Sequence, residues 1–465
     1  MSLAVKHPSS IRVLVAQRGA REHYAVARAL HQRGMLAGLV TDWYAPVWGG
    51  GRRQKSGAAP DRRSNESHRS PENDRLTNGT STIPIRKAVQ GPVTDASVFQ
   101  QLQRRYHSAL AARCDDLPDQ LIHSFPLRSA YWKWKMRNAS RRGSIYEGYA
   151  ETDAGFARAV AGIRLPPHDV FFGYSYASLE MLELEKERGM FTVVDQVDPG
   201  PVEYRLVAEE MARHPEMAGQ AAPFPESHFD RARREWNLAD MIVVNSEWSR
   251  TAIIAEGAAA EKIEVVPLCY EKAGENERAG KVIHKSAGPL RVLFLGQVNV
   301  RKGIHHLIEA ALRLVNEPVE FLIAGQPDLR PGSIAKAPPN MRWIGAVPRG
   351  QVSSVYEQSD VFVLPTLSDG FAITQLEAMK HGLPVIVTPN CGRVVEDGKT
   401  GFIVPPGDIR GLVDAIRRFI DDRNLANAMR PHCAETAMRY TLDGFGQTLI
   451  EAIKKHRGKE LVHGT

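Results

Sequence analysis

The sequence has few cysteines and no long apolar segment. Its four cysteines, Cys114, Cys269, Cys391 and Cys433, are far apart among 465 residues, and no C-x-x-C pair occurs. We therefore predict neither a cysteine-based zinc site nor a disulfide framework, and a reducing compartment suits the chain. No segment approaches the roughly 18 apolar residues of a membrane-spanning helix, and the N-terminus lacks the apolar core of a signal peptide. We expect a cytoplasmic protein.

Two phosphate-binding signatures are also missing. The chain contains no G-x-x-x-x-G-K-[ST] loop, which argues against a P-loop nucleotide hydrolase. No G-x-G-x-x-G fingerprint follows an apolar strand, so a Rossmann dehydrogenase is disfavoured. Any phosphate site must therefore be built from other glycines and cations.

Apolar and basic residues are plentiful. Apolar residues make up 43% of the chain, which indicates a folded globular protein of two or three domains. The formal charge is +7 and the pI is near 9.2. This balance favours anionic partners such as nucleotides, phosphates, nucleic acid or acidic lipid headgroups. A basic protein without such a partner fits the composition equally well.

Short apolar runs rich in Val, Ile and Phe recur along the chain. They span residues 11–16, 36–41, 169–174, 191–195, 241–245 and 263–267 in the first half, and residues 291–296, 319–325, 341–345, 361–365 and 384–388 in the second. Continuous rather than alternating apolarity predicts strands that are buried on both faces of a parallel sheet.

Helical patterns lie between these runs. Residues 247–257 end at a glycine, as helices commonly do. Two further segments each place apolar residues on one helical stripe: Ile304, Leu307, Ile308, Ala311, Leu312 and Val315 in the first, and Ile409, Leu412, Val413, Ile416 and Phe419 in residues 409–420. Alternating strands and helices predict βαβ units with right-handed crossovers.

The fold class that follows is α/β, with two doubly wound Rossmann-like domains facing a cleft. The polar, Gly-rich segment 272–288 is interpreted as a linker. We predict a first domain over residues 1–280, a second over 289–440, and a C-terminal helix over 441–465 that packs back on the first. Residues 48–95 are polar and aperiodic, which favours a long disordered loop over the alternative of a lid.

The stretch SDGFAITQLEAMKHGLPVIVT, residues 368–388, combines two acids with a helix start. Gly370 allows the backbone to approach a ligand closely. The N–H groups expected to point out of the helix start are those of Phe371, Ala372 and Ile373, and they form an anion site suited to a pyrophosphate. Glu377 leans back toward that end and can accept hydrogen bonds from ribose hydroxyls. Asp369 can reach a sugar on the other side of the phosphates, or serve only as a helix cap.

A second stretch, FLGQVNVRKGIHHLIEA at residues 294–310, places Arg301 and Lys302 just before another helix. A phosphate leaving group needs cations where its negative charge grows. The alternative is that Lys302 is an ordinary solvated charge, although a cation at a helix start is mildly unfavourable.

Together the two stretches resemble the donor-binding domain of the family 4 glycosyltransferases, which have the GT-B fold. The E-x7-E pair of that family appears here as Asp369 and Glu377, with Asp in the first position. Further matches are LEAMKHGLPVIVT and NCGRVVEDGKTGFIVPPGD, the latter at residues 390–408. The resemblance is specific over about residues 240–420. It implies that Glu377 binds the ribose and that Asp369 faces the transferred sugar.

The family's Gly-Arg…Lys-Gly phosphate motif appears here as Gly296, Gln297, Lys302 and Gly303. The resemblance implies that Lys302 binds the donor diphosphate. Gln297 stands where the family usually has an Arg, and Arg301 is the cation able to compensate. The family also implies a retaining reaction, no cofactor and no obligatory metal, and the lack of any D-x-D triplet agrees with the last point.

The first half would then hold the acceptor. Gly19 lies in a segment, residues 16–30, that resembles the family's first Gly loop beside the donor phosphates. Four polar residues follow predicted strands and are candidate acceptor contacts: Tyr174, Ser175, Asp195 and Asp198. Many family members supply a His here, and Asp195 is its nearest polar counterpart. It is a candidate base, or else a structural Asp at a strand end.

The segment YWKWKMRNASRRG, residues 131–143, interleaves aromatic and basic residues. Three interpretations remain open: a peripheral anchor on the inner face of an anionic membrane, a nucleic-acid surface, and a surface helix with one aromatic face packed inside.

The leading hypothesis is a hexosyltransferase that moves a sugar from a nucleotide-diphosphate sugar to a hydroxyl acceptor, in bacterial glycan or polysaccharide biosynthesis. The acceptor is a glycan, a lipid-linked glycan or a small molecule, and no nucleic-acid partner is expected. The alternative is a catalytically inactive GT-B-like protein that binds nucleotide or scaffolds a partner; Gln297 and Asp369 motivate it.

Overall fold

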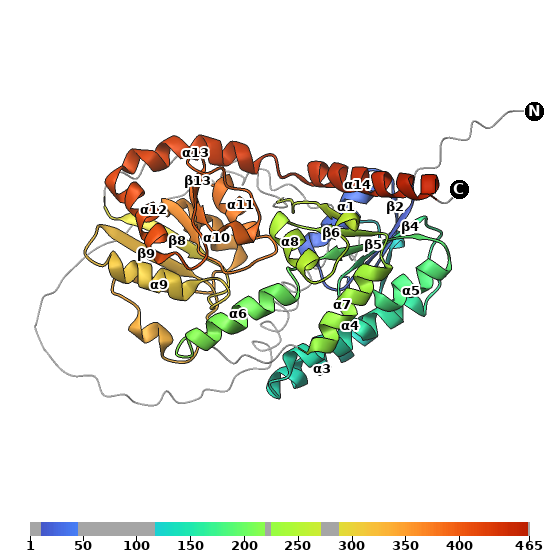
Figure 1. The fold of residues 1–465 in the computed structure, drawn as a ribbon. Helices are drawn as coiled ribbons and strands as arrows, with labels where there is room; N and C mark the ends of the chain where they lie inside the picture. The colour runs from blue at the N-terminus through green and yellow to red at the C-terminus, as the bar shows by residue number, and fades with distance from the viewer. Residues whose placement is uncertain (1–10, 45–116, 219–224, 271–287, 464–465) are drawn as a thin grey trace, which may run out of the picture. The chain divides into compact units, whose positions relative to one another are not determined.

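The computed structural model describes residues 11–44, 117–218, 225–270 and 288–463, which form two parallel sheets with helices around them (Figure 1). The predicted loop at 48–95 and, apart from its last residue, the predicted linker at 272–288 lie outside these ranges. None of the described helices is long and apolar enough to span a membrane. Cys269, Cys391 and Cys433 are buried free thiols.

The first sheet has seven strands in the order β3-β2-β1-β4-β5-β6-β7. They are β1 Val13–Gln17, β2 Leu36–Thr41, β3 Ile122–Ser124, β4 Val170–Tyr174, β5 Phe191–Gln196, β6 Met241–Val244 and β7 Ile263–Val265. The helices around it are α1 Ala25–Gln32, α3 Pro126–Arg141, α4 Ile145–Ala161, α5 Leu179–Glu187, α6 Pro201–Arg213, α7 Glu226–Leu238 and α8 Glu247–Ala255. Every strand pair is parallel.

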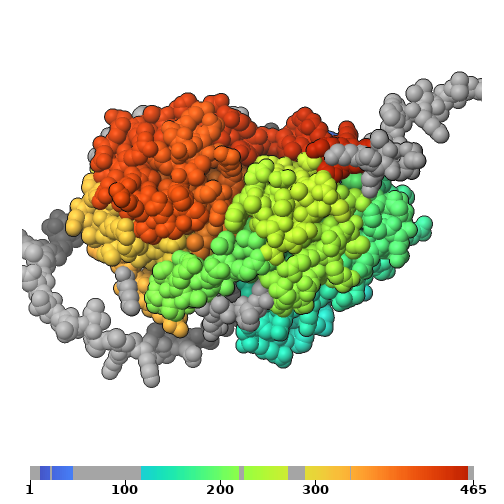
Figure 2. All heavy atoms as spheres, in the orientation of Figure 1, coloured from blue at the N-terminus to red at the C-terminus, as the bar shows by residue number. Residues whose placement is uncertain are grey.

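The second sheet has six parallel strands in the order β10-β9-β8-β11-β12-β13. They are β8 Leu290–Leu295, β9 Val319–Ala324, β10 Met341–Gly345, β11 Val361–Leu364, β12 Val385–Val387 and β13 Gly401–Ile403. Its helices are α9 Ile304–Arg313, α10 Val352–Glu357, α11 Ile373–Lys380, α12 Ile409–Asp421 and α13 Arg423–Ala437, and α14 Leu442–His463 ends the chain. In Figure 2 the orange-red atoms, which include those of α12 and α13, lie on the outer surface.

The sequence predicted eleven of these strands, and the doubly wound α/β fold class is confirmed. Strands β1, β2, β4, β5, β6, β11 and β12 are buried throughout, as their continuous apolar runs require. The two strands that were missed, β3 and β13, are edge strands of three residues each.

Each sheet reverses its strand order once, between β1 and β4 in the first and between β8 and β11 in the second. In doubly wound sheets, loops that leave the carboxyl ends of strands on either side of such a reversal diverge and leave room for a ligand. The loops in question follow residues 17 and 174 in the first sheet, and residues 295 and 364 in the second.

The first sheet has an apolar core on each face, and α14 belongs to one of them. Leu442, Leu449 and Ile453 of α14 are buried in the same cluster as Val13 of β1 and Leu30 of α1. The last helix therefore packs on the first sheet although it follows the second in sequence.

The segment at the end of α6 packs away from the first sheet and onto the second. It follows β5 of the first sheet, yet Met217 is buried in the core of the second sheet. Backbone contacts hold it there: Arg330 N–H donates to Met217 O (3.2 Å) and Ser333 Oγ donates to Glu216 O (2.7 Å). The C-terminal end of α6 is thus fixed against elements of the second half.

The predicted stripe of α9 is confirmed at Ile304, Leu307 and Ala311 and wrong at Leu312. Leu312 of α9 is 55% exposed, whereas Ala310 and Leu314 are buried. The buried arc of α9 is centred near Leu307 and Ala311, and at 100° per residue Leu312 falls on the other side of the helix. The stripe predicted for residues 409–420 is confirmed, with Leu412, Val413, Ile416 and Phe419 buried.

The turn after β4 has a strained backbone that a buried carboxylate holds. Tyr176 has φ of 69°, which is unusual for a bulky residue. Glu235 of α7 accepts hydrogen bonds from Tyr176 N–H (2.6 Å) and Ser178 N–H (2.9 Å). Burial raises the pKa of Glu235 to about 7, with Arg231 acting in the opposite direction.

Glu235→Ala should lower the free energy of unfolding by about 2 kcal/mol or more, because two buried backbone donors lose their acceptor. Urea denaturation of the full chain measures this change. Glu183→Ala is the matched control: Glu183 is 44% exposed and pairs with Arg234 at 2.7 Å, so its loss should cost below about 1 kcal/mol. Equal losses in the two variants would show that the Glu235 contacts contribute nothing specific.

Candidate active site

The loop between β8 and α9 presents two cations beside the neighbouring loop after β11. Gly303, with φ of 74°, precedes α9, and a Cβ there would lie 1.8 Å from the carbonyl oxygen of Pro365. Only glycine fits so close an approach. The contact brings Arg301 and Lys302 against the residues that follow β11.

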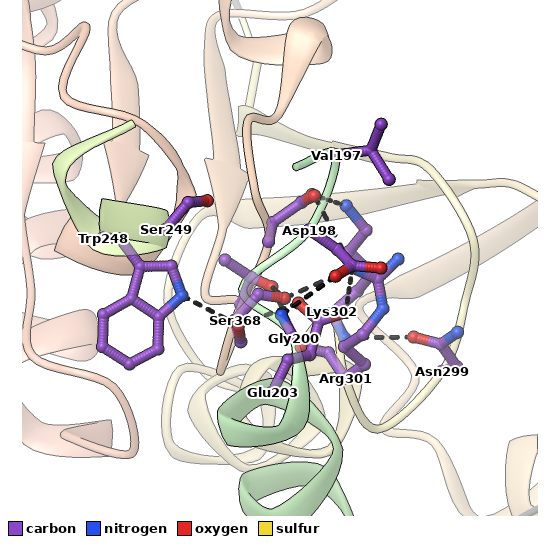
Figure 3. A network of polar contacts seen from close by, with 12 residues as sticks. Val197, Asp198, Gly200, Glu203, Trp248, Ser249, Asn299, Arg301, Lys302 and Ser368 are labelled. Atoms are coloured by element: carbon purple, nitrogen blue, oxygen red, sulfur yellow. Dashed lines mark hydrogen bonds and ion pairs between the residues drawn. The ribbon is translucent and has the colours of Figure 1, made fainter. Parts of the chain in front are cut away.

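Hydrogen bonds hold these two loops together. The carbonyl oxygen of Arg301 accepts from Leu367 N–H (2.9 Å) and from Thr366 Oγ (2.9 Å). Lys302 N–H donates to Asn299 Oδ1 (3.0 Å) (Figure 3). Both cations are thus held on a fixed backbone, which is what a preorganised electrostatic site needs.

Lys302 and Arg301 converge on Asp369. Lys302 Nζ forms an ion pair with Asp369 Oδ2, and Arg301 Nη1 lies 3.6 Å from Oδ1. The side chains of Lys302 and Asp369 are only 12% and 15% exposed. Burial acts to raise the pKa of Asp369, but the two cations more than offset it and hold the pKa below its ordinary value. Asp369 is therefore an anion at neutral pH.

Glu203, in the first turn of α6, completes this cluster. Its Oε1 lies 3.6 Å from Arg301 Nη1, and its Oε2 accepts a hydrogen bond from Ser368 Oγ (2.8 Å). Trp248 Nε1 in turn donates to Ser368 Oγ (2.9 Å), and Figure 3 shows these side chains side by side. Burial raises the pKa of Glu203 to about 7, with Arg301 acting in the opposite direction. Glu203 therefore changes charge near neutral pH.

The start of α11 differs from the sequence prediction. The helix begins at Ile373, and its N-cap, Ala372, has an extended backbone. Ala372 N–H is not available to a ligand, because it donates to Cys391 O (2.9 Å) where the chain after β12 folds back. The interpretation of Asp369 as a helix cap is also wrong: it precedes the N-cap by three residues and binds cations instead.

Gly370 and Phe371 lie against protein groups. A Cβ on Gly370 would be 2.8 Å from both Asn245 Nδ2 and Val197 O, which are hydrogen-bonded to each other. The ring of Phe371 is buried and lies where a Cβ on Gly392 would stand. The glycine at position 370 thus allows the backbone to lie close to Val197 and Asn245, which follow β5 and β6.

Glu377 lies about one turn into α11, on the same loop-and-helix unit as Asp369. Its Oε2 accepts a hydrogen bond from Tyr356 Oη (2.9 Å), and the Tyr356 ring stacks on His381 at 4.9 Å between centroids. The carboxylate is thus oriented by the Tyr356 hydroxyl of α10, whose ring is held by its stacking on His381.

The predicted phosphate-loop glycines have distinct surroundings. Gly296, with φ of 156°, ends β8, and its carbonyl oxygen would be 1.7 Å from a Cβ on Gly325. Gln297, which follows it, is exposed. Gly19, with φ of 82°, donates its N–H to Asp42 Oδ1 (2.9 Å) in the first sheet.

The candidate acceptor residues lie at the carboxyl ends of β4 and β5. Tyr174, Ser175 and Asp195 are buried there, and Ser175 N–H donates to Asp195 O (2.9 Å). Asp198 accepts from Tyr176 Oη (2.9 Å) and Gly200 N–H (2.9 Å). Its charge contributes to the raised pKa of Glu203. Asp198 is therefore electrostatically linked to the group formed by Arg301, Lys302, Asp369 and Glu203, which we call the cation cluster.

Sequence reasoning missed Glu203, Ser368 and Trp248. Glu203 is 165 residues from Ser368 in the chain, and no local motif connects them. The only available sequence signal was the position of Glu203 in the first turn of a helix that begins at Pro201. An acidic residue at that position is common in helices that have no functional role.

Comparisons with known proteins give the family of the second half. Residues 289–422 match the family model described as "Glycosyl transferases group 1". A D-inositol 3-phosphate glycosyltransferase of Corynebacterium urealyticum is 28% identical over 256 residues, which cover 49% of this chain and 59% of that protein. The amylovoran biosynthesis glycosyltransferase AmsK of Erwinia amylovora is 28% identical over 185 residues, covering 36% and 44%. The chain thus spans about half the length of the curated relatives it matches.

Solved structures share the fold at low sequence identity. Sucrose-phosphate synthase from Thermosynechococcus elongatus aligns with a TM-score of 0.57 and 16% identity, covering 97% of this chain and 100% of that one. HepE from Anabaena, solved in complex with UDP, aligns with a TM-score of 0.52 and 14% identity, covering 96% and 100%. The GT-B fold prediction is confirmed, and residues 289–422 match the family model of the group 1 glycosyltransferases.

Proposed function

We propose that the protein transfers a hexosyl group from a nucleotide-diphosphate sugar to a hydroxyl acceptor with retention of configuration. One observation carries the proposal: Arg301 and Lys302, on the loop after β8, converge on Asp369, on the loop after β11, where the strand order of the second sheet reverses. Ligands of doubly wound sheets bind at such reversals.

The two cations suit a diphosphate leaving group. As the bond to the sugar breaks, negative charge grows on the departing phosphate, and fixed cations in a partly buried site stabilise that charge. Asp369 is the carboxylate that pairs with both cations. The donor's phosphates would replace this partner, after which the Asp369 carboxylate is available for hydroxyls of the transferred sugar. Glu377, oriented by Tyr356, would accept hydrogen bonds from the ribose.

The first sheet supplies the acceptor side of the proposal. Gly19 would lie near the donor phosphates, and Tyr174, Ser175, Asp195 and Asp198 would contact the acceptor hydroxyl, with Asp195 as a candidate base. The complex of HepE with UDP supports a nucleotide donor, and the relatives named above support a role in glycan or polysaccharide synthesis. The acceptor is a glycan, a lipid-linked glycan or a small molecule.

The donor proposal is tested with UDP-, GDP- and ADP-sugars. At about 100 times its dissociation constant, a donor that binds the native chain should stabilise it by about 2.7 kcal/mol in thermal unfolding. Lys302→Gln should weaken donor binding and lower donor turnover by about 100-fold, because one fixed cation is lost from the leaving group. Calorimetry and donor hydrolysis measure the two effects.

Lys380→Gln is the control for this experiment. Lys380 ends α11 and stacks over the Tyr270 ring at 5.2 Å, outside the cation cluster. A donor that binds but is never transferred or hydrolysed would favour the inactive nucleotide-binding protein. No response to any donor, or equal effects of the two Lys variants, would contradict the diphosphate site. Proton NMR of the first product formed distinguishes retention from inversion.

Glu203 predicts a pH dependence of donor binding. Its pKa near 7 means that the side chain is neutral below this pH and anionic above it. The anion competes with the donor for Arg301 and repels its phosphates, so the dissociation constant of a nucleotide sugar should rise about three- to tenfold from pH 6 to pH 8. Glu203→Gln should abolish this rise, whereas Glu226→Gln, at an exposed position, should preserve it. A rise that persists in Glu203→Gln would assign the effect to another group.

We also propose that α3 contacts an anionic membrane. Three of its large apolar side chains are exposed: Leu127 by 87%, Tyr131 by 52% and Trp134 by 57%. The Tyr131 and Trp134 rings stack at 6.0 Å between centroids, and exposed Arg and Lys side chains flank them. Trp132 is buried, so the helix is also anchored in the fold. Aromatic and basic residues on one exposed surface favour the membrane interface.

Vesicle co-sedimentation tests this contact. The chain should bind vesicles of anionic phosphatidylglycerol and not vesicles of phosphatidylcholine alone, because Lys and Arg are attracted to the anionic surface. A double variant with Tyr131→Ser and Trp134→Ser should reduce the partition coefficient about tenfold. Met438→Ser, which removes another exposed apolar side chain, should leave it unchanged. Equal binding of both vesicle types, or of the double variant, would contradict the proposal.

A further inference from the structure

Three histidines surround one carboxylate oxygen where α6 meets α9. Glu210 Oε1 lies 2.9 Å from His305 Nε2, 3.2 Å from His306 Nε2 and 3.4 Å from His214 Nε2. The side chains of Glu210, His305 and His306 are at most 10% exposed, whereas His214 is 37% exposed. Ligand atoms of the first three all lie within 4.8 Å of one another. We call these four residues the His-Glu cluster.

The packing of α6 brings the cluster together. Glu210 and His214 come from the end of α6, whose continuation at Met217 is buried in the core of the second sheet. His305 and His306 come from the first turn of α9, immediately after Gly303. The four groups therefore meet through fixed backbone elements.

Hydrogen bonds with His305 Nε2 and His306 Nε2 use the two lone pairs of Glu210 Oε1. His214 Nε2 lies 3.4 Å from the same oxygen as an ion-pair contact. The other oxygen, Oε2, already accepts from Arg213 Nη1 (2.9 Å). The Nδ1 atom of His305 is buried without a hydrogen-bond partner among the described residues. The His305 ring is thus oriented by what lies on its Nε2 side.

The spacing matches that of a metal-binding site. Zinc binds His nitrogen and carboxylate oxygen at about 2.0–2.2 Å in a tetrahedral arrangement, which puts neighbouring ligand atoms about 3.4 Å apart. The three nitrogen–oxygen distances, 2.9, 3.2 and 3.4 Å, lie close to this value. An ion here would use three imidazole lone pairs and one carboxylate oxygen, a set that suits zinc and related divalent transition metals.

We propose that the His-Glu cluster binds one divalent transition-metal ion, of the zinc type, through Glu210, His305 and His306, with His214 as a fourth ligand. Surrounding groups orient the ligands: Arg213 holds the second oxygen of Glu210, and Glu216 Oε1 lies 3.4 Å from His214 Nδ1. Outer partners of this kind are usual for metal ligands, and here they serve Glu210 and His214. A hollow of about 700 Å³, lined by the cluster together with Glu309 and Arg313, provides an entry path.

The ion would have a structural role. It would join α6 to the first turn of α9, the helix that begins immediately after Lys302 and Gly303. The loop that carries Arg301 and Lys302 would then lead into a helix that is fixed at its start. This role does not depend on the identity of the donor or on sugar transfer.

Metal uptake by the full chain tests the proposal. After treatment with a chelator and its removal, titration calorimetry with Zn²⁺ should show one tight equivalent per chain, and elemental analysis should find one zinc after desalting. Glu210→Gln, and a double variant with His305→Ala and His306→Ala, should each weaken this binding by about 100-fold or more, because inner ligands are lost. No uptake by the wild type, or undiminished uptake by both variants, would overturn the site.

Two matched controls address zinc binding elsewhere. Glu209→Gln changes the neighbouring carboxylate on α6, which is 62% exposed, and His432→Ala removes a histidine of α13 outside the cluster. Both should bind zinc as the wild type does. If the cluster variants fail to fold by circular dichroism, Co²⁺ added to the wild type decides the question. Intense visible bands indicate the tetrahedral site expected here, and weak octahedral bands contradict it.

Discussion

The candidate active site depends on the close approach of Gly303 to the carbonyl oxygen of Pro365. A side chain at residue 303 would occupy the space of that oxygen, so the two loops can meet only through glycine. Their meeting allows Arg301 O to accept from Leu367 and Thr366, and it brings Lys302 to Asp369. The ion pair is therefore a consequence of backbone geometry. Without a fixed backbone, ordering two long cationic side chains would cost more rotamer entropy than their ion pairs with one carboxylate would offset.

Local sequence signals predicted those parts of the structure that local physics determines. Continuous apolar runs marked eleven strands, because burial on both faces favours apolar residues along a parallel strand. Lys302 and Asp369 were found because each stands just before a helix in a short motif. Glu203 was not found, since its partners Ser368 and Arg301 are distant in sequence. The N–H of Ala372 was assigned to a ligand because nothing near it in the chain predicts that Cys391 O takes the hydrogen bond.

The His-Glu cluster could be predicted from local sequence signals even less than Glu203 could. His305 and His306 are adjacent, and neighbours on a helix point about 100° apart, so their spacing resembles no metal motif. Glu210 and His214, four residues apart, share a face of α6, which is also common in ordinary surface helices. Only the burial of Met217 against the second sheet turns that face toward α9. Tertiary packing, which no pattern in the chain reveals, creates the convergence of the four groups.

Helix α6 links the two sites. Glu203 and Glu210 are seven residues apart, close to two helical turns, so both carboxylates lie on one face of α6. The first reaches Arg301 and Ser368, and the second reaches His305 and His306. All four partners belong to loops and a helix start at the carboxyl edge of the second sheet. A displacement of α6 along its axis must therefore change the surroundings of Arg301 and of the histidines together. The helix that follows β5 of the first sheet thus sets the electrostatics of the cations that the second sheet provides.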